Sequence, residues 1–191
     1  MTSVAPAETT VTFRISIIIR LTLKLLFIAL TLPLPFLARA TAAPVPPALL
    51  WVGMAIGFGA LWGALSERVF IDAEGIRVGY PAWVPGWFRS GWSLAWAEVA
   101  DLRLRTTGQG GVVYYFVTQA GDRAYLLPMR VAGFSRLLEQ VERYTAIDTR
   151  NVRPLAQPWM YGILFVISTL LLAIDLWTIN TAANFAGFPV S

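Results

Sequence analysis

The chain has 191 residues, of which 57% are hydrophobic and only 14% are charged. Soluble domains carry about 25% charged residues, so this composition excludes an ordinary soluble protein and indicates a membrane protein. The lack of cysteine and histidine excludes disulfides, thiolate metal sites and a histidine general base. The net charge is +4 and Lys24 is the only lysine, so arginine carries almost all of the basic charge.

The N-terminal part combines a polar tail with a first apolar segment. Residues 1–13 are small and polar, and we expect them to form a disordered tail. Residues 14–38 are predicted to form a transmembrane helix with basic residues near its start. Arg20 and Lys24 are four residues apart, so they share one helix face and can extend to the same membrane interface.

This first apolar segment has a second interpretation, as a secretory signal peptide. A basic region is followed by the uncharged run 25–37 and by Ala38, Arg39 and Ala40, which match an Ala-x-Ala cleavage site. A retained helix is favoured because a second apolar segment follows after a short loop. The N-terminal residue of the mature protein distinguishes the two interpretations.

A proline-rich link leads into the clearest apolar segment, residues 47–65, which is predicted to form a second transmembrane helix and a hairpin with the first. Small residues recur along it at Gly53, Gly57, Ala60 and Ala64. Small residues let two helix backbones approach closely. We expect this stripe to pack against the chain's own helices, with self-association or docking on a membrane-protein partner as the alternatives.

A more polar interval, residues 67–149, predicts a small folded domain between membrane helices. Its first hairpin joins the β-prone runs 69–71 and 76–78. Asp72 and Gly75 stand at the first and last positions of a type I turn between these runs.

The rest of the domain predicts an antiparallel meander closed by a helix. Four further β-prone runs are expected, with a bulge near residues 100–101; they are residues 92–96, 99–105, 112–118 and 123–129. Apolar residues then recur at helical spacing from Val131 to Tyr144, which predicts an amphipathic helix.

Residues 79–91 interrupt the strands with prolines and aromatic residues, including Trp83 and Trp87. The prolines argue against a helix. Because the domain is tethered to the membrane at both ends, these rings can lie at the headgroup level, where tryptophan is favoured. The alternative is that the rings close the core of the domain.

A third transmembrane helix is predicted at residues 154–179, followed by a loose tail at 180–191. Asp175 lies near the outer end of this helix, on the same side as Arg39, so the two can pair or simply face the interface. Basic residues gather before the first helix and between the second and third. The positive-inside rule therefore predicts a cytoplasmic N-terminus and a cytoplasmic domain.

Several segments of the domain form a recognisable series: residues 70–76 (Phe-Ile-Asp-Ala-Glu-Gly-Ile), 94–99 (Leu-Ala-Trp-Ala-Glu-Val), 125–128 and the helix 134–144. This series resembles the bacterial PH-like domains found beside transmembrane hairpins, over about residues 67–145. The resemblance implies a strongly bent antiparallel sheet capped by one helix, and says little about a ligand. The chain departs from it by the loop 79–91 and by the third helix.

The whole chain is also similar to small conserved membrane proteins of cyanobacteria. That resemblance implies a location in the inner membrane, or in the thylakoid membrane of a cyanobacterium. The predicted fold is therefore an α+β membrane protein with a two-helix hairpin, a cytoplasmic PH-like domain and a third transmembrane helix.

The sequence predicts a non-enzymatic interaction, scaffold or assembly factor, because no catalytic, metal-binding or cofactor-binding motif is present. The alternatives are a sensor of anionic lipids and an accessory subunit of a transporter or photosynthetic complex. Expected partners are membrane lipids and a membrane protein or a second copy, and not nucleic acid. The candidate lipid or partner surface consists of Arg77, Trp83, Trp87, Arg89, Arg103, Arg105, Arg123 and Arg130.

Overall fold

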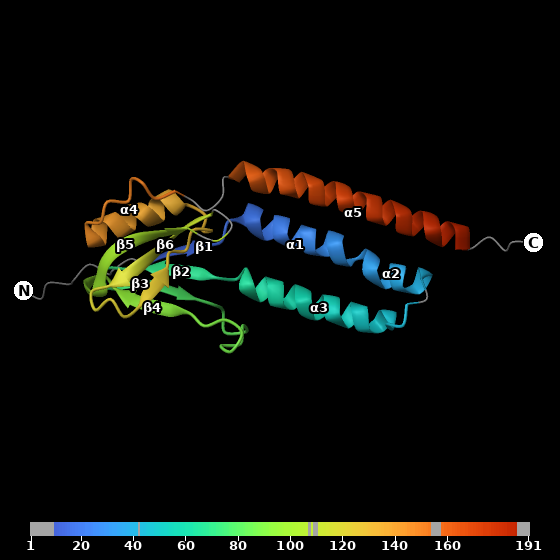
Figure 1. Cartoon of the computed structure of the whole chain (residues 1–191), viewed down its shortest axis with the longest axis horizontal. Helices are drawn as coiled ribbons and strands as arrows, with labels where there is room; N and C mark the ends of the chain where they lie inside the picture. Colours follow the sequence, from blue (N-terminus) through green and yellow to red (C-terminus); the bar gives the residue numbers. More distant parts are fainter. Residues whose placement is uncertain (1–9, 42, 107, 109–110, 154–157, 187–191) are drawn as a thin grey trace, which may run out of the picture. The chain divides into compact units, whose positions relative to one another are not determined.

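The computed structural model describes residues 10–41, 43–106, 108, 111–153 and 158–186. The chain divides into two compact units. One, the β unit, consists of Met1–Ser16 and Ser66–Ala156; the other, the helical unit, consists of Ile17–Leu65 and Gln157–Ser191. The predicted α+β class with antiparallel sheets and three apolar helices is confirmed (Figure 1).

The first sheet of the β unit has four antiparallel strands in the order β1-β2-β3-β4. They are β1 (Val11–Arg14), β2 (Arg68–Ile71), β3 (Gly75–Gly79) and β4 (Trp92–Ala95). The expected turn joins β2 to β3, where Asp72 Oδ1 accepts hydrogen bonds from the backbone N–H groups of Glu74 (3.1 Å) and Gly75 (3.0 Å). A side chain at Gly75 would collide with the backbone carbonyl of Leu94, so the close approach of β4 requires glycine here.

Strand β1 corrects the expectation of a disordered tail through residue 13. Val11 pairs with Ile71 and Arg14 pairs with Arg68, and the side chain of Phe13 is buried in the core. These residues form a strand because the open edge of β2 supplies hydrogen bonds that a local sequence pattern does not reveal. The first helix consequently begins at Ile17 and not at residue 14. The remainder of the expected tail, residues 1–9, lies outside the described residues.

The second sheet has three antiparallel strands in the order β5-β6-β7. They are β5 (Val99–Thr106), β6 (Val112–Thr118) and β7 (Ala124–Leu126), and the short 3₁₀ helix η1 (Trp96–Glu98) leads from β4 into β5. The register between β5 and β6 shifts between Val99 and Asp101, which confirms the expected bulge.

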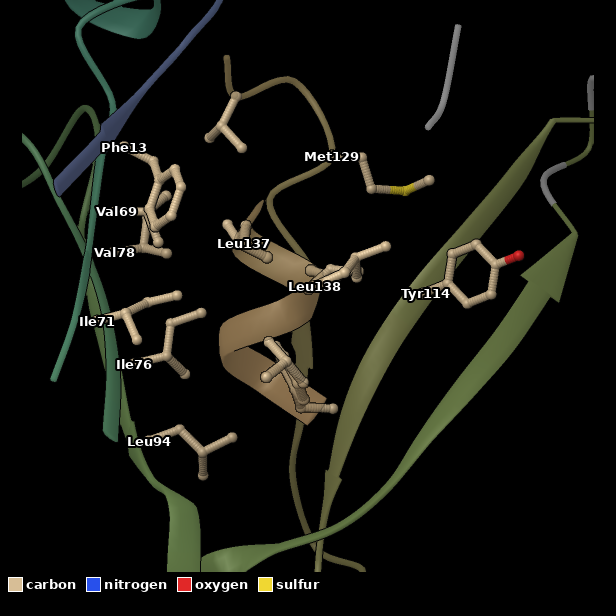
Figure 2. Close-up of a cluster of buried hydrophobic side chains, with 14 of the residues drawn as sticks. Phe13, Val69, Ile71, Ile76, Val78, Leu94, Tyr114, Met129, Leu137 and Leu138 are labelled. Atoms are coloured by element: carbon tan, nitrogen blue, oxygen red, sulfur yellow. The ribbon is translucent and has the colours of Figure 1, made fainter. Parts of the chain in front are cut away.

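Helix α4 (Phe134–Thr145) supplies one wall of the core between the two sheets. Figure 2 shows Leu137 directed toward Val69 and Val78 of the first sheet and Leu138 directed toward Tyr114 of the second. Leu137 and Val141 are fully buried. The helical spacing of these apolar residues therefore marks the face that closes the core.

The helical unit contains α1 (Ile17–Thr31), α2 (Pro33–Ala40), α3 (Pro47–Ala64) and α5 (Pro158–Ala186). Three segments are long and apolar enough to cross a membrane: Ile17–Ala40, Pro47–Ala64 and Trp159–Ala182. The first is broken into α1 and α2 because Pro33 and Pro35 remove backbone N–H groups from the helical hydrogen-bond pattern.

Helix α5 also extends beyond its predicted end at residue 179, into the expected loose tail. It continues to Ala186, and the Thr181 hydroxyl donates to the Trp177 carbonyl oxygen at 2.7 Å. No proline or glycine interrupts this stretch before Gly187, so the helix has no local reason to end earlier. The ends of the predicted helix and tail at residues 154–157 and 187–191 lie outside the described part of the chain.

We expect the substitution Leu137→Ala to lower the free energy of unfolding of the β unit by about 2–5 kcal/mol, because it leaves a cavity at a fully buried site. Pulse proteolysis of the purified full chain across a urea series measures this change. Leu126→Ala is the matched control, since Leu126 is 47% exposed and should shift the midpoint little. Equal shifts for the two variants would contradict the assignment of α4 to the core.

Candidate functional site

The first sheet has one end at which the chain enters the helices. Arg68, the first residue of β2, pairs with Arg14 of β1 and with Gly79 of β3. Only Ile15 and Ser16 separate β1 from α1, and only residues 65–67 separate α3 from β2. We call this end of the sheet, formed by Arg14, Arg68 and Gly79, the tethered end.

The loop 80–91 leaves the β unit at the tethered end, because it joins the end of β3 to the start of β4. Two short turns shape it, with hydrogen bonds from Val84 N to Pro81 O (2.9 Å) and from Phe88 N to Pro85 O (3.0 Å). Val84 is buried and anchors the loop, whereas Trp83 is 56% exposed and Trp87 is 88% exposed. These two rings do not close the core, so that alternative is excluded for them.

Tyr80 fixes the start of the loop to the tethered end. Its hydroxyl donates a hydrogen bond to Glu67 Oε2 at 2.9 Å. Burial, the negative charge of Glu67 and this hydrogen bond raise the pKa of Tyr80 to about 12, and the charges of Arg89 and Arg130 oppose the shift. The sequence pattern did not single out Tyr80 or Glu67, because they are 13 residues apart and meet only through the pairing of β2 with β3.

The six candidate arginines are all exposed, but the structure does not gather them on one face. Arg89 lies in the loop, and Arg130 lies beside it because its carbonyl accepts a hydrogen bond from Ser16 N at the end of β1 (3.0 Å). Arg77 lies on β3, with its guanidinium 5.9 Å from the Phe70 ring centroid. The remaining three, Arg103, Arg105 and Arg123, line a hollow on the second sheet.

This hollow of about 220 Å³ lies on the face of β5-β6-β7 that turns away from the core. Arg103 and Arg105 pair in register with Tyr115 and Val113. Acidic neighbours partly neutralise the arginines, since Arg103 lies 3.4 Å from Asp101 and Arg123 lies 3.6 Å from Asp122. The surface therefore combines aromatic and apolar groups with a small excess of positive charge.

The predicted small-residue stripe on α3 is divided between two surroundings. A Cβ atom at Gly57 would lie 3.0 Å from Phe27 Cζ, so Gly57 packs against α1. A Cβ atom at Gly53 would meet nothing within 4 Å, and Ala60 and Ala64 are half-buried. The close approach of helix backbones is therefore used within the chain at Gly57 and leaves Gly53 open.

Asp175 does not form the expected pair with Arg39: among the described residues no ion pair joins them, and its Oδ2 atom is buried without a hydrogen-bond partner. Within the same described ranges, no group of three or more acidic residues could hold a metal ion.

The fold and these surfaces define a class: an α+β protein with two antiparallel sheets and three helices able to cross a membrane. The chain is 56% identical over 160 residues to the "Uncharacterized protein slr0269" of Synechocystis sp. (strain ATCC 27184 / PCC 6803 / Kazusa), and the alignment covers 83% of this chain and 80% of that protein. The chain belongs to the same family as this cyanobacterial protein. No protein-family model and no solved structure matches the chain.

The contact between Tyr80 and Glu67 has a defined pH range. An unfolded tyrosine ionises near about pH 10, so the stabilisation from holding Tyr80 neutral is fully present below that pH and is lost as the pH rises through about 12. We expect Glu67→Gln to lower the pKa of Tyr80, which stays above its ordinary value because burial is the largest cause.

Phenolate absorbance during alkaline titration measures this pKa, with the Tyr80→Phe variant subtracted to isolate the signal. Glu74→Gln, at the exposed tip of the first hairpin, is the control and should leave the titration unchanged. An unaltered Tyr80 titration in Glu67→Gln would show that this contact does not exist in solution.

Proposed function

We propose that this protein is a non-enzymatic integral membrane protein whose β unit, a PH-like module, binds the surface of the membrane that contains its own helices. The observation that carries the proposal is the exposure of Trp83 and Trp87 on a loop that leaves the tethered end. Solvent-facing tryptophans are unfavourable without a partner, and the bilayer interface is the environment that indole rings prefer.

The length of the connecting chain supports this proposal. A residue spans at most about 3.5 Å, so the links of two and three residues keep the tethered end within roughly 10–14 Å of the ends of α1 and α3. The headgroup layer is about 5–8 Å thick on each side of a bilayer. The loop 80–91 therefore starts within reach of this layer.

Charge at the same end favours an anionic surface. Arg89 and Arg130 flank Tyr80, and each basic group near such a surface contributes about 1 kcal/mol. The basic residues before α1 and between α3 and α5 favour a cytoplasmic location for the β unit. The two antiparallel sheets with α4 between them agree with the bent, helix-capped sheet that the PH-like resemblance implies.

A spin label at residue 86 tests the docking of the loop. The chain has no cysteine, so Gly86→Cys gives a single labelling site, and a side chain there meets nothing within 4 Å. In vesicles containing anionic lipid we expect the label to gain contact with oxygen and lose contact with a water-soluble relaxation agent. Ala73→Cys, at the opposite end of the same hairpin, is the control and should remain in water. Equal water exposure at both sites would rule out docking through the loop.

The hollow on the second sheet favours a second candidate function, that of a scaffold for a membrane-protein partner. Its three arginines surround Tyr115, which suits an acidic segment of a partner with an apolar side chain. An assembly factor or accessory subunit would use this face while the loop holds the β unit at the membrane.

Charge reversal separates this candidate from lipid docking. We expect the double substitution Arg103→Glu and Arg105→Glu to dissociate a partner complex seen on native gels of membranes solubilised in mild detergent, without changing the label depth at residue 86. Arg77→Glu is the control, because Arg77 lies on the other sheet. An unchanged complex in the double variant would remove the hollow as the partner site.

A further inference from the structure

Two basic side chains of α1 lie within a helix able to cross a membrane and have no acidic partner in the described residues. Arg20 and Lys24 are about 4.5 Å and 10.5 Å beyond Ile17 along the helix axis. They are four residues apart, so their side chains are neighbours on one face. Two like charges in this position destabilise the helix unless an anion compensates them.

Helix α3 gives this basic pair an aromatic wall. The Lys24 ammonium lies 3.7 Å from the centroid of the Trp62 ring. Farther along the same helix pair, the Phe27 and Phe58 rings are 6.0 Å apart, and Phe58 meets Trp62 edge-on at 5.9 Å. The surface thus places cations near the helix ends and an apolar aromatic ladder next to them.

The chain supplies no counter-ion for this pair within the helical unit. Its one acidic residue is Asp175 on α5. Figure 1 shows α1 and α5 running in the same direction, and the Thr22 hydroxyl lies 3.3 Å from the Tyr161 carbonyl oxygen. Asp175 is fourteen residues beyond Tyr161 and Lys24 is two beyond Thr22, which separates them by about 18 Å along the axis. Glu67, the acid next to α3 in sequence, already accepts the hydrogen bond of Tyr80.

We propose that Arg20, Lys24 and Trp62 form a binding site for the headgroup of an anionic glycerolipid. The phosphodiester oxygens accept hydrogen bonds from the Arg20 guanidinium and the Lys24 ammonium. The Trp62 indole, two residues before the end of α3, lies at the boundary between headgroups and acyl chains, as is usual for tryptophan. An acyl chain then follows Phe27 and Phe58 toward the middle of the bilayer.

This site is independent of the proposed docking of the loop 80–91, because it lies wholly on α1 and α3. The loop binds a surface of many lipids, whereas Arg20, Lys24 and Trp62 bind one lipid molecule. A variant of the loop and a variant of the helices therefore fail separately.

Native mass spectrometry of the purified full chain, titrated with phosphatidylglycerol or phosphatidylcholine, tests the site. We expect the wild type to retain phosphatidylglycerol preferentially, and Arg20→Gln with Lys24→Gln to bind it about 30-fold more weakly, since each cation contributes about fivefold. Arg39→Gln, which removes the exposed arginine at the far end of the first membrane segment, is the matched control and should bind like the wild type. Trp83→Ala with Trp87→Ala should also bind like the wild type.

Further arms keep the result decisive. Lys24→Arg preserves the charge and should retain binding within a few-fold, and the single variants Arg20→Gln and Lys24→Gln decide the question if the double variant does not fold. Inorganic phosphate should not displace the lipid; displacement would identify a free anion as the ligand and overturn the lipid assignment. Equal retention of phosphatidylglycerol by the wild type and the glutamine variants, or equal retention of the two lipids by the wild type, would also overturn it.

Discussion

The antiparallel pairing of β1 with β2 is the constraint on which the rest of the structure depends. Both strands continue into helices after links of two and three residues, so the edge of the first sheet is an extension of the α1–α3 helix pair. Because β3 returns to Arg68 at Gly79, everything that follows Gly79 starts at this tethered end. The position of the aromatic loop is thus a consequence of strand register and not of any preference of the loop itself.

The same constraint gives the charged residues different roles. Arg89 and Arg130 are held at the tethered end with Tyr80 and Glu67, where charge and aromatic side chains can both meet a bilayer. Arg103, Arg105 and Arg123 lie on the outer face of the other sheet, beside acids that neutralise part of their charge. One positive balance in the sequence therefore corresponds to at least two surfaces with different chemistry, one suited to lipids and one suited to a protein segment.

The helical unit shows how local and nonlocal requirements are met together. Gly57 allows Phe27 to approach α3, and this contact places the aromatic ladder that ends at Trp62 beside Lys24. Pro33 and Pro35 divide the first membrane segment into α1 and α2 without preventing it from being long enough to cross a bilayer. The membrane helices are therefore also a candidate surface for lipid recognition, in addition to anchoring the β unit.

Much of the fold could be predicted because it is written in local periodicity. Runs of apolar residues define the three membrane helices, Asp72 and Gly75 define the first turn, and the spacing from Val131 to Tyr144 defines α4. Strand β1 could not be predicted in this way, because Val11–Arg14 is ordered by β2, more than fifty residues away in the sequence. The same is true of the contact between Tyr80 and Glu67 and of the exposure of Trp83 and Trp87, which depend on the register of β2, β3 and β4.

The sequence by itself determined which segments are helices or strands, the antiparallel α+β class and the absence of histidine and cysteine chemistry, because composition and spacing are properties of the chain alone. Only the tertiary structure decided which arginines share a surface, which tryptophans face outward and which ring lies against Lys24. The physical reason is that hydrophobic periodicity specifies the buried face of each element. The neighbours of an exposed side chain depend on how distant elements pair and pack.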